Sequence, residues 1–319
     1  MRNTTLRQLR SLQAIHACGK ISNAAKELGL TAPAVTLQLK QLEEDIGLTL
    51  FDRTPDGMRP TAAGLAVLDA ARAVDERLRM LADEIDAISG RRIGNLKLGV
   101  VSTAKYFAPR LMAAFQQQHP GIQVDLHVGN RAKTIDALRR HDLDIVLMGR
   151  PPREVPVRSL VFGEHPFVII APAGHPSAAK RGIAKAEIAA ERFLIREPGS
   201  GTRISLEIFF ADIPEKLEDL GTEMGSNETI KQAVMAGLGI AFISAHTIEQ
   251  ELQLRRLVIL DVQGMPILRQ WFSVSRLDRS LSPAMLAFND FLTRDGSRYL
   301  PASGDPATRI GVLDPDQSR

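Results

Sequence analysis

The sequence predicts an α/β protein that begins with an all-α helix-turn-helix unit and continues through a long helix into a larger domain. Three observations carry this prediction. Residues 21–50 contain two short helical patterns separated by a glycine. Residues 62–89 form a proline-free run with apolar residues every three or four positions. After residue 94, strand-like runs alternate with helical segments, which is typical of βαβ units and mostly parallel sheets.

The first predicted helix starts at Thr5, because Thr5 and Gln8 have the spacing of a capping box. Ser22 is then expected to cap the first helix of the helix-turn-helix, and Gly29 to end it in a left-handed conformation. An ordinary helical hairpin of a protein core is the alternative interpretation of residues 21–50.

Thr31 is expected to open the second helix of this pair, with Pro33 in the first turn, where a missing N–H costs nothing. Its predicted buried stripe is Val35, Leu39 and Leu42. Its outward residues are polar or small and not acidic, as a DNA-reading helix requires: Thr31, Ala32, Thr36 and Lys40.

Residues 50–61 predict a short hairpin, or wing, in which Arg53 and Arg59 flank a Pro-Asp-Gly turn. Basic residues on a wing can contact DNA phosphates or the minor groove, whereas a solvated arginine pair is the alternative. The helix that follows is roughly 40 Å long at 1.5 Å per residue. A small domain cannot bury its stripe, so we expect the same helix of a second subunit to pack against it.

The larger domain is predicted from a series of strand-like and helical runs. The strands are expected at 95–102, 121–130, 143–150, 166–172, 192–197, 221–226, 239–244, 256–262 and 269–276. The helices are expected at 107–119, 133–141, 202–211, 228–236, 246–254 and after Ser282. Residues 295–319 contain three prolines and little apolar periodicity, so we expect a largely disordered tail.

Four strand-to-helix junctions carry hydroxyl, amide or cationic side chains: 101–105, 129–133, 197–203 and 225–229. In open α/β sheets ligands bind outside the carboxyl ends of strands, against helix N-termini. Plain N-caps are the alternative for each junction alone. Together they predict a site for an anion with several oxygens.

Composition excludes several classes of protein. A net charge of +3 and a pI near 9.1 suit a nucleic-acid binder without requiring one. Cys18 is the only cysteine, the start of the chain does not resemble a signal peptide, and no apolar run approaches the roughly 18 residues of a membrane span. We therefore expect a cytoplasmic protein.

Catalytic motifs are missing from the sequence. The seven histidines lack metal-ligand spacing, and no GxSxG elbow occurs. The run Gly199–Gly201 lacks the third glycine of a dinucleotide fingerprint and the Gly-Lys-Ser/Thr of a P-loop. We expect no catalytic residue, no metal site, no cofactor and no enzyme activity.

The runs ISNAAKELGLTAPAVTLQLKQLEEDIGLTLFDR and PTAAG resemble the winged helix-turn-helix of LysR-type transcriptional regulators. Further runs are similar to the branch that regulates Calvin-cycle carbon-fixation operons, including those of ribulose bisphosphate carboxylase. They are VVSTAKYFAPRLMAAF, GNR, MGRPP, REPGSGTR, MGSNETIKQAVMAGLGIAFIS and PILRQWF. The resemblance covers about residues 3–294.

The resemblance implies residues 1–61 as DNA-binding domain, 62–92 as linker and hinge, and 93–294 as a periplasmic-binding-protein-like effector domain. Lobe I would comprise 93–165 and 269–294, and lobe II 166–268, with the effector between them. The effector would be an anionic or phosphorylated metabolite, such as a Calvin-cycle intermediate or a reduced nicotinamide nucleotide. Its implied contacts are Ser102, Thr103, Lys105, Asn130, Arg131, Arg150, Gly201, Thr202, Arg203, Asn227 and Glu228.

The implied partners are double-stranded DNA with an interrupted palindrome, a second or further copies of the chain as homodimer or homotetramer, and RNA polymerase. Family members often carry Gln or Ser at Ala32 and a longer polar residue at Leu37, so this chain departs at both. The expected DNA-binding residues are Ser22, Thr31, Ala32, Pro33, Thr36, Gln38, Lys40, Arg53 and Arg59. A LysR-type regulator of another operon and a cytoplasmic solute-binding protein are the alternative functions.

Overall fold

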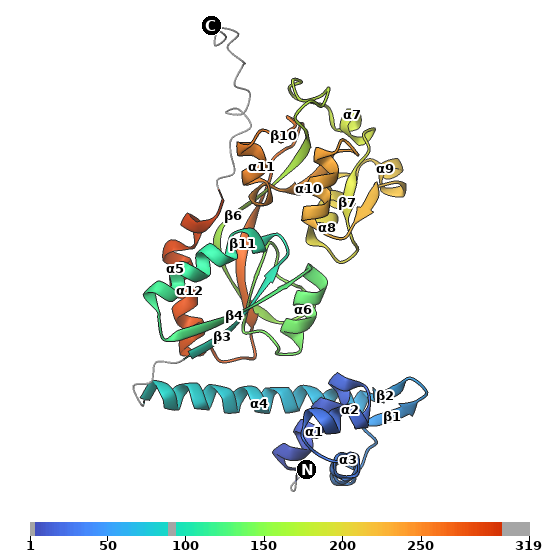
Figure 1. The fold of residues 1–319 in the computed structure, drawn as a ribbon, viewed down its shortest axis with the longest axis vertical. Coiled ribbons are helices and arrows are strands. Elements are labelled where there is room, and N and C mark those ends of the chain that lie inside the picture. The colour runs from blue at the N-terminus through green and yellow to red at the C-terminus, as the bar shows by residue number, and fades with distance from the viewer. Residues whose placement is uncertain (1–3, 89–93, 302–319) are drawn as a thin grey trace. The chain divides into compact units, whose positions relative to one another are not determined.

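The computed structural model describes residues 4–88 and 94–301, and the chain divides into two compact units, Met1–Ala82 and Asp83–Arg319 (Figure 1). The N-terminal unit is built from α1 (Leu6–Cys18), α2 (Ile21–Glu27) and α3 (Ala32–Ile46), which pack around one apolar core. α1 begins with the predicted capping box. Thr5 Oγ1 accepts a hydrogen bond from Gln8 N at 3.3 Å, and Gln8 Oε1 accepts one from Thr5 N at 2.7 Å.

The turn between α2 and α3 confirms two of the three predicted helix ends. Gly29 adopts a left-handed φ of 64°, and Thr31 caps α3 by accepting from Ala34 N at 3.4 Å. The prediction for Ser22 was wrong. Lys20 occupies the N-cap position without a side-chain bond, and Ser22 is an exposed residue inside the first turn of α2. The predicted stripe of α3 is buried: Val35, Leu39 and Leu42.

The predicted wing is an antiparallel hairpin of β1 (Phe51–Thr54) and β2 (Gly57–Pro60). It is held against the α1–α2 turn, because Met58 N donates to Gly19 O at 2.8 Å. Gly57 permits this approach. Its φ is +135°, and a Cβ there would lie 2.3 Å from Gly19 O. The close contact therefore fixes the wing relative to the helices.

α4 (Ala62–Ile88) follows the wing as a 27-residue helix. Thr61 caps it by accepting from Gly64 N at 3.0 Å. Its first turns pack against the core of the N-terminal unit through Val67 and Leu68. Further along, an apolar stripe at four- and three-residue spacing is exposed: Val74, Leu78, Leu81 and Ile85.

The second unit is organised by a seven-stranded sheet in the order β10-β6-β11-β5-β3-β4, with β9 also paired to β6. The strands are β3 (Gly94–Val101), β4 (Ile122–Gly129), β5 (Ile145–Met148), β6 (Val157–Pro172), β9 (Ala241–Ser244), β10 (Leu257–Ile259) and β11 (Ile267–Arg276). The sheet is mixed, which corrects the expectation of mostly parallel strands. Only β3–β4 and β3–β5 are parallel, while β6 and β11 run antiparallel to their neighbours.

β6 and β11 are long because they pass through two separate cores. Phe162 of β6 and Trp271 of β11 belong to one core, whereas Phe167 and Ile267 pack in another. We call the part around the first core lobe I, and the part around the second core and an adjoining apolar cluster lobe II. The sixteen-residue strand β6 starts before the predicted strand, and its first half belongs to lobe I.

Lobe I carries α5 (Ala108–Gln118) and α12 (Pro283–Asp295) side by side, with α6 (Arg131–Arg139) apart from them (Figure 1). Phe115 and Phe288 join α5 and α12 through an edge-to-face contact at 5.0 Å. The 3-10 helix η1 (Ala104–Tyr106) precedes α5. The expected tail is ordered at its start, where Gly296–Tyr299 forms η3 and Leu300 packs on the lobe I core. Residues 302–319 lie outside the described residues.

Lobe II adds a two-stranded parallel sheet of β7 (Leu194–Arg196) and β8 (Thr222–Met224). Its principal helices are α8 (Gly201–Phe209) and α10 (Asn227–Met235), each starting at a strand-to-helix junction that the sequence marked. The helix expected at 246–254 is divided into η2 (Ala245–Thr247) and α11 (Glu249–Gln253). Short helices α7 (Lys185–Ala189) and α9 (Pro214–Glu218) complete the lobe.

Candidate nucleic-acid interface and ligand cavity

The exposed side of α3 presents Thr31, Pro33 and Lys40 to solvent, with Ala32 and Thr36 partly covered. Thr36 Oγ1 donates to Ala32 O at 2.9 Å, and Lys40 Nζ lies 3.5 Å from Glu44 on the same helix. An exposed pair of this kind contributes little, so Lys40 remains available to a phosphate. A base-reading role for these residues stays a prediction.

Gln38 is partly buried at the contact between α3 and α1, and its role in DNA binding stays a prediction. Ser11 Oγ of α1 donates to Gln38 Oε1, and Ser11 is fully buried. Gln38 therefore joins α3 to α1. Leu37 is instead 55% exposed, so an apolar side chain occupies the surface beside the polar residues of α3.

The two wing arginines lie on opposite faces of the hairpin. Arg53 pairs with Met58, and Arg59 pairs with Asp52 in the antiparallel register. Because successive residues of a strand alternate between faces, Arg53 and Arg59 cannot grip one phosphate group together. Both side chains are exposed. Figure 1 shows this hairpin of β1 and β2 at one end of the N-terminal unit.

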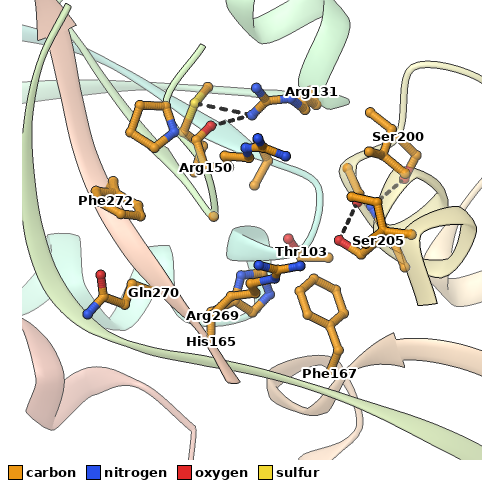
Figure 2. Close-up of a pocket in the computed structure, with 18 of the residues that line it drawn as sticks. Thr103, Arg131, Arg150, His165, Phe167, Ser200, Ser205, Arg269, Gln270 and Phe272 are labelled. Carbon is orange, nitrogen blue, oxygen red and sulfur yellow. Dashed lines mark hydrogen bonds between the residues drawn. The ribbon is translucent and has the colours of Figure 1, made fainter. Parts of the chain in front are cut away.

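A cavity of about 950 Å³ lies between lobe I and lobe II, and its floor is formed by β6 and β11 (Figure 2). That volume is at the upper end for a small-molecule site. Six of the predicted effector residues line it: Ser102, Thr103, Arg131, Arg150, Gly201 and Thr202. The sequence junctions after β3, before α6 and before α8 therefore meet at one place, as expected of strand ends in an α/β sheet.

The cavity wall is rich in guanidinium groups, with four arginines against two glutamates. Burial lowers the pKa of Arg131, which nevertheless stays charged, and Arg131 Nη1 donates to Arg150 O. Arg150, Arg153 and Arg269 make no ion pair within residues 4–88 and 94–301. These cations lie in one cavity and can bind several oxygens of an anion.

The opposite wall is the start of α8, which supplies hydroxyl groups. Ser200 caps the helix by accepting from Thr202 N at 3.3 Å, and Ser205 Oγ donates to Gly201 O at 3.0 Å. In Figure 2, Ser200 and Ser205 face Arg131 and Arg150 across the cavity. The start of a helix carries partial positive charge, which favours the same kind of ligand as the arginines do.

Sequence reasoning missed the cavity floor and the residues next to it: Arg153, Glu154, Glu164, His165, Phe167, Ile204, Ser205, Ile208, Leu268, Arg269, Gln270 and Phe272. Most of them lie on or beside β6, β11 and α8. No local signal marked them, since the floor is created where two strands cross between lobes. The MGRPP and PILRQWF runs were the nearest indication in the sequence.

The other five predicted effector residues do not line the cavity: Lys105, Asn130, Arg203, Asn227 and Glu228. Three of them, Lys105, Asn130 and Glu228, make contacts between the lobes, while Asn227 binds Arg196 within lobe II. We define the polar seam as Ser102, Lys105, Tyr106, Arg110 and Asn130 of lobe I with Arg196, Glu197, Asn227, Glu228 and Glu249 of lobe II. Arg203 instead contacts groups of lobe II, donating to Glu223 at 3.0 Å and to Glu207 at 3.1 Å.

Arg196 is the centre of the seam and was not predicted. It is 3% exposed, donates to Asn227 Oδ1, and reaches Ser102 Oγ of lobe I at 3.2 Å. It also forms a two-pronged pair with Glu197, at 2.7 and 2.8 Å. Burial raises the pKa of Glu197, but hydrogen bonds from Arg196 and the backbone outweigh that effect and lower it overall.

Four further contacts extend the seam, one of them from Arg110 to Glu249 at 3.4 Å. Asn130 Nδ2 donates to Glu197 Oε1 at 3.3 Å, while Asn130 Oδ1 caps α6. Tyr106 donates to Glu228 at 2.6 Å, and Lys105 lies 3.8 Å from the same carboxylate. Of the predicted residues, Lys105 and Glu228 thus contact each other across the lobes, and Asn130 contacts a residue that was not predicted. Asn130 is thus the N-cap of α6 and also an interlobe hydrogen-bond donor, while its contact with an anion stays a prediction.

Beneath the cavity, aromatic rings stack where the lobes join. His165 of β6 lies 3.8 Å from Trp271 of β11, with 14° between the ring planes. Trp271 Nε1 donates to His246 Nδ1 at 3.0 Å, and His165 Nε2 lies 3.0 Å from Ser244 Oγ. All four side chains are buried. This cluster ties both crossing strands to lobe II.

The described residues contain no group of three or more His, Cys, Asp or Glu side chains that could hold a metal ion. Within the same residues, no helix combines the length and apolarity needed to cross a membrane.

Comparison with known proteins identifies two matching families. The model for the bacterial regulatory helix-turn-helix protein, lysR family, matches residues 6–65, and that for the LysR substrate binding domain matches residues 89–297. The chain is 63% identical to the HTH-type transcriptional regulator CbbR of Sinorhizobium medicae over 306 residues, which are 96% of this chain and 98% of that protein.

Two further proteins are similar. The RuBisCO operon transcriptional regulator of Allochromatium vinosum is 45% identical over 296 residues, covering 93% of this chain and 98% of that protein. The regulatory domain of CcmR from Synechocystis PCC6803, solved in complex with 2-PG, has a TM-score of 0.58 and 36% identity. That match covers 63% of this chain and 96% of the solved chain.

Proposed function

We propose a function from the premise that the chain belongs to the LysR family of bacterial transcriptional regulators. It is a DNA-binding regulator and not an enzyme. We infer that it controls carbon-fixation genes of the Calvin cycle in response to an anionic, phosphorylated metabolite bound between its lobes. The observation that carries this inference is the cavity with four arginines, in a chain 63% identical to a regulator named CbbR.

For DNA binding, we propose that α3 enters the major groove and the wing contacts the backbone. Thr31, Pro33, Thr36 and Lys40 are the proposed reading residues, with Arg53 on the wing. Ala32 and Arg59 remain candidates for peripheral contacts, whereas Ser22 and Gln38 are better assigned to α2 and to the α1–α3 contact. DNA in a bacterium is cytoplasmic, so the regulator acts there.

The exposed stripe of α4 supports dimerisation through the linker helix. Val74, Leu78, Leu81 and Ile85 recur at heptad spacing, and burying them needs a second helix. A two-fold dimer places two recognition helices about 34 Å apart, so the operator should be an interrupted palindrome. The proposed linker limits are residues 62–92. Tetramers and contact with RNA polymerase are further proposals of the same kind.

For effector binding, we propose that the anionic groups of the ligand bind Arg131, Arg150, Arg153 and Arg269, while Thr202 and Ser205 bind its neutral oxygens. The 2-PG bound by the Synechocystis relative supports a phosphorylated ligand. The polar seam would keep the lobes together beside the cavity. A ligand can change transcription only if it binds one lobe arrangement or assembly more tightly than another.

Calorimetry with 2-PG tests the effector site. Arg131→Ala should weaken binding about tenfold or more, because one charge-assisted contact contributes about 1.5–3 kcal/mol. Arg203→Ala is the matched control, since Arg203 follows Thr202 on α8 but binds Glu207 and Glu223 outside the cavity. Equal losses in both variants would contradict the proposed cavity.

The gene target is tested separately by gel shift. The full chain should bind the upstream region of a carbon-fixation operon as paired half-sites, with affinity that falls steeply as salt rises. If the chain bound only the upstream region of a different metabolic operon, it would still be a LysR-type regulator, but the assignment to carbon-fixation genes would be rejected.

A further inference from the structure

Leu37 is an apolar residue at the centre of the solvent-facing side of α3. The buried stripe of this helix, formed by Val35, Leu39 and Leu42, is at most 5% exposed, whereas Leu37 is 55% exposed. At about 100° per residue, Leu37 lies about 200° around the helix axis from Val35, so it points almost directly away from the buried stripe. Single exposed leucines are common on protein surfaces, so the surroundings of Leu37 decide whether it has a role.

The residues around Leu37 leave the start of α3 with few side chains that can donate a hydrogen bond to a base. Pro33 and Ala34 lie one turn before Leu37 and carry no polar side-chain atom. Thr31 Oγ1 caps the helix by accepting from Ala34 N at 3.4 Å. Thr36 Oγ1 donates its only proton to a backbone carbonyl one turn earlier, at 2.9 Å, so it can accept a hydrogen bond from a base but cannot donate one. The centre of this surface is therefore apolar over the first two turns of α3.

The apolar group that bases present in the major groove is the 5-methyl group of thymine. The other base atoms that a protein reads there are hydrogen-bond donors and acceptors. In a helix-turn-helix, the N-terminal residues of the second helix contact these base edges, and Leu37 lies in the second turn of α3. An apolar side chain pressed on a donor or acceptor would remove its water without replacing the hydrogen bond, which is unfavourable. A thymine methyl group is therefore the contact that fits Leu37 best.

We propose that Leu37 is a specificity-determining residue of the DNA-binding unit and that its side chain packs on the 5-methyl group of one thymine in each operator half-site. This inference rests on the proposal that α3 enters the major groove. Lys40 lies one turn further along the same side of α3 and is also exposed. A phosphate contact by Lys40 positions the helix without reading sequence, whereas the contact made by Leu37 discriminates between bases.

The experiment removes the methyl group from the DNA and the side chain from the protein, singly and together. The full chain first selects duplexes from a random-sequence pool, so the test does not depend on which genes the protein controls. Each thymine of the selected duplex is then replaced by uracil, which lacks only the 5-methyl group. Wild type, Leu37→Ala and the control Leu254→Ala are compared on every duplex by fluorescence anisotropy. Leu254 is a 71% exposed leucine of lobe II, so its truncation removes an exposed leucine side chain outside the DNA-binding unit.

The proposal expects one thymine in each half-site at which uracil weakens wild-type binding about fourfold, the effect of one buried methyl-sized group, and about fifteenfold when both are replaced. Leu37→Ala should bind the thymine and the uracil duplexes equally, while Leu254→Ala should respond as wild type does.

Two results would overturn the proposal and retain sequence-selective DNA binding. One is an equal response of wild type and Leu37→Ala at every thymine, which would assign the methyl contact to another residue. The other is a wild-type chain that is insensitive to uracil at every position. If the wild-type chain selected no common sequence, the proposed reading of DNA by α3 would fail, and this inference with it.

A second pair of variants keeps the proposal testable if Leu37→Ala binds DNA too weakly to be compared. Leu37→Met keeps an apolar side chain of similar size and should keep the preference for thymine. Leu37→Gln introduces an amide of similar size and should lose that preference in a repeated selection, with the other positions unchanged. In wild type, 5-methylcytosine should also bind better than cytosine at this position, because it restores the methyl group at the same place. Retention of the thymine preference in Leu37→Gln would overturn the proposal.

Discussion

Acidification should destabilise this protein well before its carboxylates titrate, because two histidines are buried in the neutral state where the lobes join. Burial lowers the pKa of His246 to about 4, with Arg110 adding to the effect. Burial holds the pKa of His165 well below 6.5, and His246 contributes in the same direction. In the unfolded chain both rings return to the ordinary value near 6.5.

The direction in which stability changes with pH follows from the number of protons that the folded and the unfolded chain bind. A histidine whose folded pKa is depressed binds fewer protons when folded, so its contribution to stability is present above pH 6.5 and is lost as the pH falls toward the folded pKa. For His246, lowering the pH from 7 to 5 should therefore cost about 2 kcal/mol of unfolding free energy. His165 adds a loss of the same sign.

Urea denaturation of the full chain at pH 7, 6 and 5 measures this loss. Trp271 is the only tryptophan and lies in the histidine cluster, so its fluorescence follows unfolding at the relevant place. His246→Asn keeps an acceptor for Trp271 Nε1 but cannot titrate, and should reduce the loss by about 2 kcal/mol. His127→Asn, at an exposed position of β4, is the control. The same pH dependence in wild type and His246→Asn would refute the reasoning.

Four other changes test separate parts of the structure. Lys40→Ala should weaken DNA binding for all sequences and lower the salt slope in gel shifts by about 1, and an unchanged slope would remove Lys40 from the phosphate contacts. Arg196→Leu leaves the partly buried Glu197 and the buried Asn227 without their donor and should cost about 1–3 kcal/mol, seen as a fall in Tm; a Tm equal to wild type would show that Arg196 does not stabilise the seam. Leu78→Glu should lower the sedimentation coefficient toward that of the monomer, and an unchanged coefficient would show that α4 has no partner helix. Gly57→Ala brings a Cβ to 2.3 Å from Gly19 O and should destabilise the N-terminal unit by about 1–3 kcal/mol, whereas a neutral effect would mean that the wing moves freely.

The sequence alone determined the local structure around the helix-turn-helix and most of the secondary structure beyond it. Two helices begin at predicted caps, α1 at Thr5 with Gln8 and α3 at Thr31, and α2 ends at Gly29. Each of these ends depends on a hydrogen bond or a backbone conformation that involves residues only a few positions away. Such interactions depend only on the identity of neighbouring residues, and can therefore be predicted from the sequence. The prediction that Ser22 is an N-cap was wrong, because a serine inside the first turn cannot be distinguished by sequence from a serine at the cap.

The junctions that hold hydroxyl, amide and cationic groups were also predictable, because strand ends in an α/β sheet gather at one edge. The sequence did not predict which of these residues line the cavity and which form the polar seam. Arg131 and Thr202 line the cavity, whereas Asn130, next to Arg131, makes an interlobe hydrogen bond and Asn227 binds Arg196 within lobe II. The direction of a side chain at a turn depends on which hydrogen-bond partners the other lobe places near it.

Only the tertiary structure decided the cavity floor and the centre of the seam. Arg196 contacts Ser102 across 94 positions of sequence, and His165 meets Ser244 across 79. The first contact depends on how the two lobes pack together, and the second on the register in which β6 and β9 pair, with Phe167 opposite Ser244. Register is set by the packing of two whole cores at once. No local pattern contains that information, so residues of the cavity walls could be predicted from the sequence and His165 at the floor could not.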